Sequence, residues 1–224
     1  MSRFALFIIV LTFCACATLP VIQVPAPTAL GKKISCPSPF LQEKYRLIHA
    51  IESSVSGRLQ GTMIGITVAD PVHRQVSCAI MSAEGMVMFE AEASPDSLKI
   101  NRALPPLDSA SFARDMIDDI MLIFFRPEGK LEKAGYLEDG SIVCRYQAQD
   151  GGQIDVITSR QGKTVIRRYT SHGALQRKIT LRDAPVKPYE HIELQAGGLV
   201  DYSLIMNLIE SQPVDNDLPL EEIK

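Results

Sequence analysis

Three aspartates stand close together at residues 115–119, and paired carboxylates can carry general acid–base catalysis. Asp115 and Asp119 are four residues apart, which places them on the same face of a helix, and Asp118 lies beside them. Catalysis would need these carboxylates to oppose each other across a cleft, with shifted pKa values. Apolar residues surround them at helical spacing, so we interpret the aspartates as the solvated face of an amphipathic helix.

The four histidines form no recognisable metal site or catalytic group. His49, His73, His172 and His191 fall in four separate segments of the chain, without the spacing typical of zinc ligands, and we interpret them as solvated surface side chains. The sequence also has no GxSxG, HExxH, Walker or GxGxxG motif and no CxxC pair. We therefore predict that the protein is not an enzyme and that it uses no metal and no cofactor.

Charge and aromatic content argue against a nucleic-acid partner. The chain has 23 basic and 26 acidic residues, a net charge of −3, no tryptophan and only 6% aromatic residues. A nucleic-acid-binding surface would usually show a basic excess or a set of stacking aromatic side chains.

An export leader begins the sequence. Arg3 precedes an apolar run over residues 4–13, the layout of a secretory signal. A run of this length is too short to cross a bilayer, which needs about 20 apolar residues.

A cysteine that follows this run resembles the lipobox cysteine of bacterial lipoproteins, which is diacylated on sulfur with chains such as palmitate. Cys16 follows the small residue Ala15, whereas Cys14 follows the bulky Phe13 and fits less well. We predict a signal peptide over 1–15 and a lipid anchor on Cys16. By resemblance to enterobacterial lipoprotein sorting, Ala17 in place of an aspartate after the acylated cysteine implies an outer-membrane address facing the periplasm. The alternatives are an ordinary cleaved signal and a retained anchor.

The rest of the chain divides into a tether, one domain and a tail. Residues 16–39 are rich in proline and lack hydrophobic periodicity, which is typical of a semi-extended linker. Residues 40–211 contain the folded domain, and 212–224 form an acidic tail. Cys36, Cys78 and Cys144 remain after Cys16, and the sequence leaves their pairing open.

Hydrophobic periodicity predicts the elements of the domain. An amphipathic helix is expected at Phe40–Val55, where apolar residues recur at spacings of three and four. A second helix is expected over 109–125, with Phe112, Met116, Ile120 and Phe124 on one face and an end that is apolar all round. The expected strands cover 62–68, 75–82, 85–92, 97–102, 142–146, 154–157, 164–169, 176–182, 191–194 and 201–209.

This layout resembles the LolA/LolB-like superfamily of periplasmic lipoprotein carriers and receptors. The resemblance covers roughly residues 40–210 and includes the lipobox, an N-terminal helix, strands, a mid-chain helix, and closing strands around Val186–Leu194 and Tyr202–Leu208. It implies an α+β fold, an antiparallel curved sheet or half-barrel with helices packed on its concave side. It also implies that Phe112, Met116, Ile120 and Phe124 line a lipid-binding cavity.

The resulting hypothesis is a lipid-anchored envelope protein that binds acyl chains of a lipoprotein or glycolipid for delivery to the outer membrane. Its partners would be the membrane, through the N-terminal lipid, and these acyl chains. The alternative is a non-enzymatic scaffold lipoprotein that binds other envelope proteins.

Overall fold

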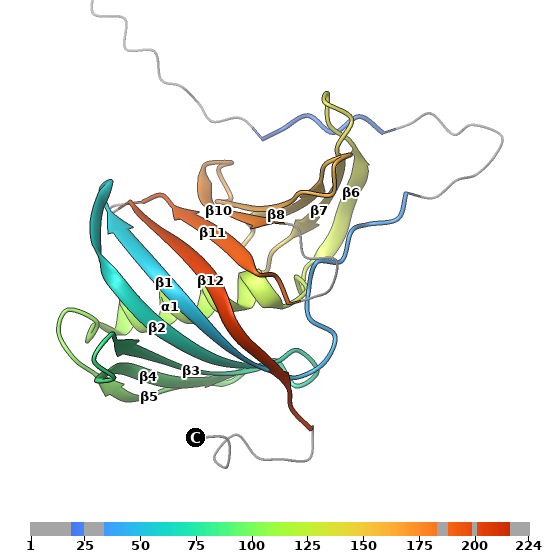
Figure 1. Ribbon diagram of the computed structural model, residues 1–224. Helices are drawn as coiled ribbons and strands as arrows, with labels where there is room; N and C mark the ends of the chain where they lie inside the picture. Colours follow the sequence, from blue (N-terminus) through green and yellow to red (C-terminus); the bar gives the residue numbers. More distant parts are fainter. Residues whose placement is uncertain (1–18, 25–33, 183–187, 199–200, 216–224) are drawn as a thin grey trace, which may run out of the picture.

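The computed structural model describes residues 19–24, 34–182, 188–198 and 201–215. These residues form one twelve-stranded antiparallel sheet and a single α-helix (Figure 1). Cys16 and residues 216–224 of the predicted tail lie outside the described residues. The predicted fold is therefore confirmed as a large curved antiparallel sheet, but it is mostly β, with one helix where several were expected.

The strands follow a meander that the helix interrupts once. In sheet order they run β5, β4, β3, β2, β1, β12, β11, β10, β9, β8, β7 and β6. The first strand, β1, and the last strand, β12, are therefore neighbours in the middle of the sheet. Their bounds are β1 Tyr45–Val55, β2 Arg58–Asp70, β3 Gln75–Ser82, β4 Val87–Ser94, β5 Ser97–Ala103, β6 Lys130–Tyr136, β7 Ile142–Gln147, β8 Gln153–Thr158, β9 Thr164–Tyr169, β10 Leu175–Arg182, β11 His191–Ala196 and β12 Tyr202–Pro213. The helix α1 covers Ala110–Phe124.

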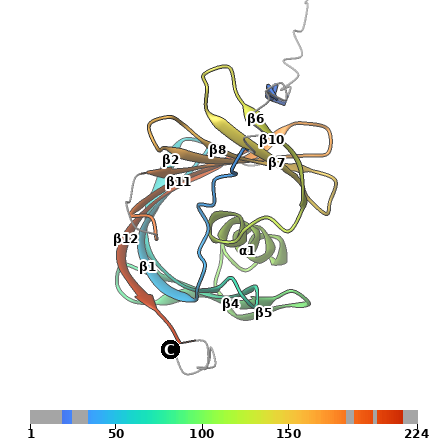
Figure 2. The same cartoon turned by 90° about the vertical axis from the view of Figure 1, so that its right-hand side faces the viewer.

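The sheet curves around α1, which lies on its concave side (Figure 2). Successive side chains of a strand point to opposite faces, and here the alternating faces belong to different clusters. In β7, Cys144 belongs to the main core that surrounds α1, whereas its neighbour Val143 belongs to a small cluster on the outer, convex face.

The predicted helix at Phe40–Val55 is wrong, because Tyr45–Val55 forms strand β1 between β2 and β12. The helical pattern counted Ile48 and Ile51 as one face, but they lie on opposite faces of the strand. Leu47, which that pattern left out, is fully buried in the core. A central strand with apolar residues on both faces can show the same three- and four-residue spacing as a helix. The β-branched residues of this segment indicate a strand more reliably than the spacing indicates a helix.

Strand β6 was not predicted from the sequence. It is an edge strand, and five of its seven residues, including the cations Lys130 and Lys133, are exposed. Charged residues on an edge strand protect it from pairing with other chains, and they also remove the hydrophobic alternation by which strands are predicted.

The N-terminal part of the chain lies against the folded body at two places. Residues 34–44 run along the open side of the sheet beside α1 (Figure 2), where Phe40 and Leu41 are buried and the Leu41 amide donates to the Phe124 carbonyl at 3.0 Å. A disulfide between Cys36 and Cys144, 108 residues apart, fixes this segment to the inner face of β7. Residues 19–24 lie outside the sheet, above β6 (Figure 1).

We expect loss of the disulfide to destabilise the protein substantially. Breaking a link across a loop of about 100 residues removes roughly 4 kcal/mol of stability in the chain-entropy model. Urea unfolding of Cys36→Ser/Cys144→Ser, followed by circular dichroism, measures this loss. Cys78→Ala is the control, because Cys78 is buried and not in a disulfide, so this variant keeps the Cys36–Cys144 link. Dithiothreitol should therefore lower the stability of Cys78→Ala. It should not lower that of the double variant, which has no disulfide to reduce. An equal response of both proteins to the reductant would contradict the pairing.

Candidate functional site

Helix α1 begins and ends at residues that satisfy its terminal backbone groups. The hydroxyl of Ser109 accepts a hydrogen bond from the Phe112 amide at 3.1 Å, as an N-cap does. At the other end the Phe125 amide donates to the Met121 carbonyl, and Pro127 follows two residues later, where a helix cannot continue. The helix predicted over 109–125 is therefore confirmed within one residue at each end.

The four predicted lipid-binding residues face the concave surface of the sheet. Phe124 is buried, while Phe112, Met116 and Ile120 are half-buried and pack against the main core. The Phe112 ring meets the Phe89 ring of β4 edge to face, with 5.7 Å between centroids. These contacts place all four side chains between helix and sheet, where the helix itself now fills the space.

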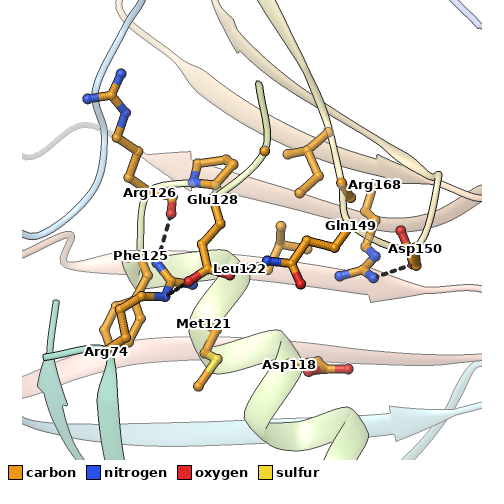
Figure 3. A pocket seen from close by; sticks show the side chains of 14 residues that line it. Arg74, Asp118, Met121, Leu122, Phe125, Arg126, Glu128, Gln149, Asp150 and Arg168 are labelled. Carbon is orange, nitrogen blue, oxygen red and sulfur yellow. Dashed lines mark hydrogen bonds and ion pairs between the residues drawn. The ribbon is translucent and has the colours of Figure 1, made fainter. Parts of the chain in front are cut away.

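A cleft of about 260 Å³ opens at the C-terminal end of α1 (Figure 3). Its floor is apolar and consists of Met121, Leu122 and Phe125 with Ile154 of β8. Leu122, Phe125 and Ile154 are also members of the main core, so the floor of the cleft is the surface of the core. The apolar end of the helix points to this region in the sequence. The residues predicted to bind lipid are not those that line the cleft, because Phe112, Met116, Ile120 and Phe124 lie on a neighbouring face of the helix.

Polar side chains connect the two sides of the cleft. Arg74, from the turn before β3, lies 2.5 Å from a carboxylate oxygen of Glu128 and donates to the Arg126 carbonyl at 3.2 Å. Gln149, from the turn after β7, donates to the other oxygen of Glu128 at 3.2 Å (Figure 3). Glu128 thus joins the β3 side of the sheet to the β7 side above the apolar floor.

A second, smaller groove of about 110 Å³ follows the polar face of α1. Within it, Asp119 is buried and accepts a hydrogen bond from Arg177 of β10 at 2.8 Å and a short one from the Tyr202 hydroxyl of β12. The Arg177 guanidinium also lies over the Tyr202 ring, 5.5 Å from its centroid. This set of Asp119, Arg177 and Tyr202, here called the helix latch, fixes α1 to two strands.

Burial sets the protonation behaviour of the helix latch. Burial raises the pKa of Asp119, against the opposing effects of Tyr202 and Arg177. Burial opposes the charged form of Arg177, but the Asp119 carboxylate more than offsets this, and the pKa of Arg177 is raised. Burial and the Asp119 charge both raise the pKa of Tyr202. The interpretation of all three aspartates as a solvated face is therefore wrong for Asp119, whereas Asp115 and Asp118 are exposed.

His49 is a buried imidazole on the concave face of β1. Its ring lies 6.1 Å from that of Phe124, and its Nε2 atom has no hydrogen-bond partner among the described residues. Burial lowers the pKa of His49 to about 4. The surface position expected for this histidine is wrong, because the strand that replaces the predicted helix turns it inward.

Two kinds of site are absent from the described part of the chain. No group of three or more His, Cys, Asp or Glu side chains there is placed to hold a metal ion. No helix in those residues is both long and apolar enough to cross a membrane.

Two solved structures have a fold similar to this curved antiparallel sheet with a helix on its concave side. A LolA superfamily protein from Nitrosomonas europaea superposes with a TM-score of 0.54 at 11% identity, covering 83% of this chain and 91% of that one. A putative outer membrane lipoprotein-sorting protein domain from Vibrio parahaemolyticus superposes with a TM-score of 0.50 at 10% identity, covering 80% and 88%. No protein-family model and no curated protein matches the sequence. The chain thus has a LolA-like fold.

We expect the helix latch to contribute more to stability than its exposed neighbour. Asp119→Ala leaves Arg177 half-buried without its partner and should lower the free energy of unfolding by about 3 kcal/mol. Asp115 is exposed and lies 3.8 Å from the same guanidinium, so Asp115→Ala should cost about 0–1 kcal/mol. Urea unfolding of both variants measures the difference. Equal losses would show that the latch does not hold α1.

His49 should make stability depend on pH. Its pKa is lowered in the folded state, so the unfolded chain binds a proton more readily as the pH falls below the ordinary histidine value. Stability should therefore be complete above about pH 6.5 and fall by roughly 3 kcal/mol on approaching pH 4. Urea unfolding of His49→Leu at several pH values should show this slope removed. The exposed His172→Gln serves as the control and should retain it.

Proposed function

We propose that the protein is a lipid-anchored carrier or receptor for acyl chains in the cell envelope. The observation that carries the proposal is the cleft at the end of α1, whose apolar floor is continuous with the core beneath the helix. The LolA-like fold supports the same function, because the solved neighbours include a putative outer membrane lipoprotein-sorting domain. The acyl chains would belong to a lipoprotein or glycolipid, and delivery would be to the outer membrane.

The size of the cleft determines how binding would occur. Pockets that enclose a small molecule usually measure about 300–1,000 Å³. The cleft of about 260 Å³ is smaller and is lined partly by charged residues. An acyl chain would therefore start on Met121, Leu122 and Phe125 and extend beneath α1 only when the helix moves. It would then replace the contacts that Phe112, Met116, Ile120 and Phe124 make with the sheet.

Binding in this mechanism is a partition between water and an apolar groove. Each buried methylene contributes about 0.8 kcal/mol. The helix latch and the Arg74–Glu128–Gln149 connection oppose it, because both hold the helix end and the two sides of the sheet together. Release of the chain would follow when these polar contacts re-form. Cys16 would anchor the carrier through its own acyl groups, facing the periplasm.

A scaffold lipoprotein that binds other envelope proteins is the second candidate. One observation favours it, an apolar strip on the convex face of the central strands. The strip consists of the partly exposed residues Ile48, Ile64 and Ile66 with the exposed residues Ile205 and Ile209. An apolar sheet face of this kind often marks a protein interface.

We expect the protein purified from membranes to carry lipid and to take up a fluorescent fatty acid. Mass spectrometry would identify both the co-purified lipid and the acylated peptide that begins at Cys16. Met121→Trp narrows the cleft and should weaken uptake roughly tenfold, because excluding about two methylenes costs about 1.6 kcal/mol at about 0.8 kcal/mol each.

A matched substitution provides the control. Met86→Trp adds the same side chain at an exposed turn and should leave uptake unchanged. Absence of both co-purified lipid and fatty-acid uptake would contradict the carrier function. Specific capture of one envelope protein, lost in Ile205→Asp/Ile209→Asp, would then support the scaffold.

A further inference from the structure

Residues 19–24 are bound to the convex face of the sheet, on the side away from α1 (Figure 1). Gln23 and Tyr136 of β6 exchange two backbone hydrogen bonds of 2.9 Å. Ile22 is buried against Val143 and Ile157. Arg145 donates to the Pro20 carbonyl at 3.1 Å. These contacts fix the position and direction of the chain just after the predicted acylation site.

A row of charged residues crosses the same face from β6 to β10. The strand registers place Lys133 beside Arg145, Arg145 beside Asp155, Asp155 beside Arg167, and Arg167 beside Lys178. Asp155 is fully buried and is satisfied by two hydrogen bonds of 2.7 Å from Arg145.

Three cations of this row remain available. Lys133, Arg167 and Lys178 form no ion pair with an acidic side chain within the described residues. Lys133 is exposed, and the other two are partly exposed. We call these three residues the basic row. The row is a local feature, because the whole chain has a net charge of −3.

Apolar side chains accompany the basic row. Val21 and Val24, in the segment bound over this face, are 81% and 59% exposed. Exposed valines on the same face as cations that form no ion pair within the described residues give the composition that binds membrane interfaces, where apolar groups enter the headgroup region and cations attract anionic lipids.

Chain length brings this face close to the anchor. Cys16 precedes Pro20 by four residues, and four residues span at most about 14 Å. An acylated Cys16 would therefore keep the bound segment within one to two Debye lengths of the bilayer, where screening is incomplete. The opposite end of the sheet, at β4 and β5, has no such connection to the anchor.

We propose that the convex face of β6–β10 is a membrane-binding surface, on which the basic row contacts anionic phospholipid headgroups while the cleft beside α1 stays accessible from the periplasm. This inference rests on the anchor at Cys16 in the proposed function. It goes beyond that function because it assigns the surface, its residues and the lipid class.

The test uses the full protein purified from membranes and reconstituted into vesicles that contain a headgroup-labelled quencher. A fluorophore on Gln147→Cys reports on the proposed surface, and one on Thr62→Cys reports on the convex face of β2. The native Cys78 thiol is buried with its pKa raised to about 12, so it should not react with the label. In phosphatidylglycerol vesicles we expect quenching at position 147 to exceed that at position 62 severalfold.

Charge variants identify the cause. Lys133→Gln/Arg167→Gln/Lys178→Gln should reduce quenching at position 147 to the level at position 62, as should pure phosphatidylcholine vesicles. Arg58→Gln/Lys99→Gln/Arg102→Gln removes the same charge from the β2–β5 half of the sheet and should change nothing.

The outcomes separate the two proposals. Equal quenching at both positions, or quenching indifferent to the basic row, would overturn the membrane-binding surface alone. Protein that leaves the vesicles altogether would overturn the anchor and this surface with it. Fatty-acid uptake, measured on the same samples, reports on the carrier function independently of either result.

Discussion

Twelve strands that curve without closing leave a concave apolar face, and keeping water from that face is the constraint on which the other contacts depend. In the described part of the chain, α1 and the segment at residues 34–44 cover it. The helix supplies the apolar side chains, while the Cys36–Cys144 disulfide and the buried Phe40 and Leu41 hold the segment beside it. A helix that fills a groove by contacts with side chains can be displaced by another apolar group of similar size, which is the physical basis of the proposed acyl-chain binding.

Polar contacts determine how firmly the helix stays in place. Asp119, Arg177 and Tyr202 connect its polar side to β10 and β12, and Glu128 connects the segment after it to both sides of the cleft. Hydrogen bonds among buried charged groups contribute little net stability but penalise any arrangement in which one partner is left alone. They therefore favour one closed position of α1 over partly opened ones. His49 acts in the opposite direction, because a buried ring nitrogen, here Nε2, without a hydrogen-bond partner among the described residues is a cost of the closed position.

Helices and strands with a regular hydrophobic period could be predicted from the sequence. Strands whose hydrophobic pattern depends on a central or an edge position in the sheet could not. The helix expected over 109–125 and the strands expected over 142–146, 154–157, 164–169 and 176–182 have regular periodicity, and the structure confirms them. Strand β1 was mistaken for a helix because both of its faces are apolar, and the edge strand β6 was missed because most of its residues are exposed. The helix latch joins residues 58 and 83 positions apart, so no local pattern in the sequence marks it. The burial of His49 followed directly from the error in β1.

The N-terminal chain contacts both faces of the sheet formed by β6–β10. Residues 19–24 bind the outer face through Arg145, and Cys36 binds the inner face through Cys144, the residue just before Arg145 in β7. Adjacent residues of one strand thus hold one part of the chain outside the sheet and another part inside it. A force on the proposed anchor would reach the body at Arg145 and the segment beside α1 at Cys144. The described residues of the predicted tether over 16–39, which are 19–24 and 34–39, therefore both contact the folded body. If the proposed anchor at Cys16 holds the protein to a bilayer, these two attachments would give the body a defined orientation there, which a free linker of the same length would not provide.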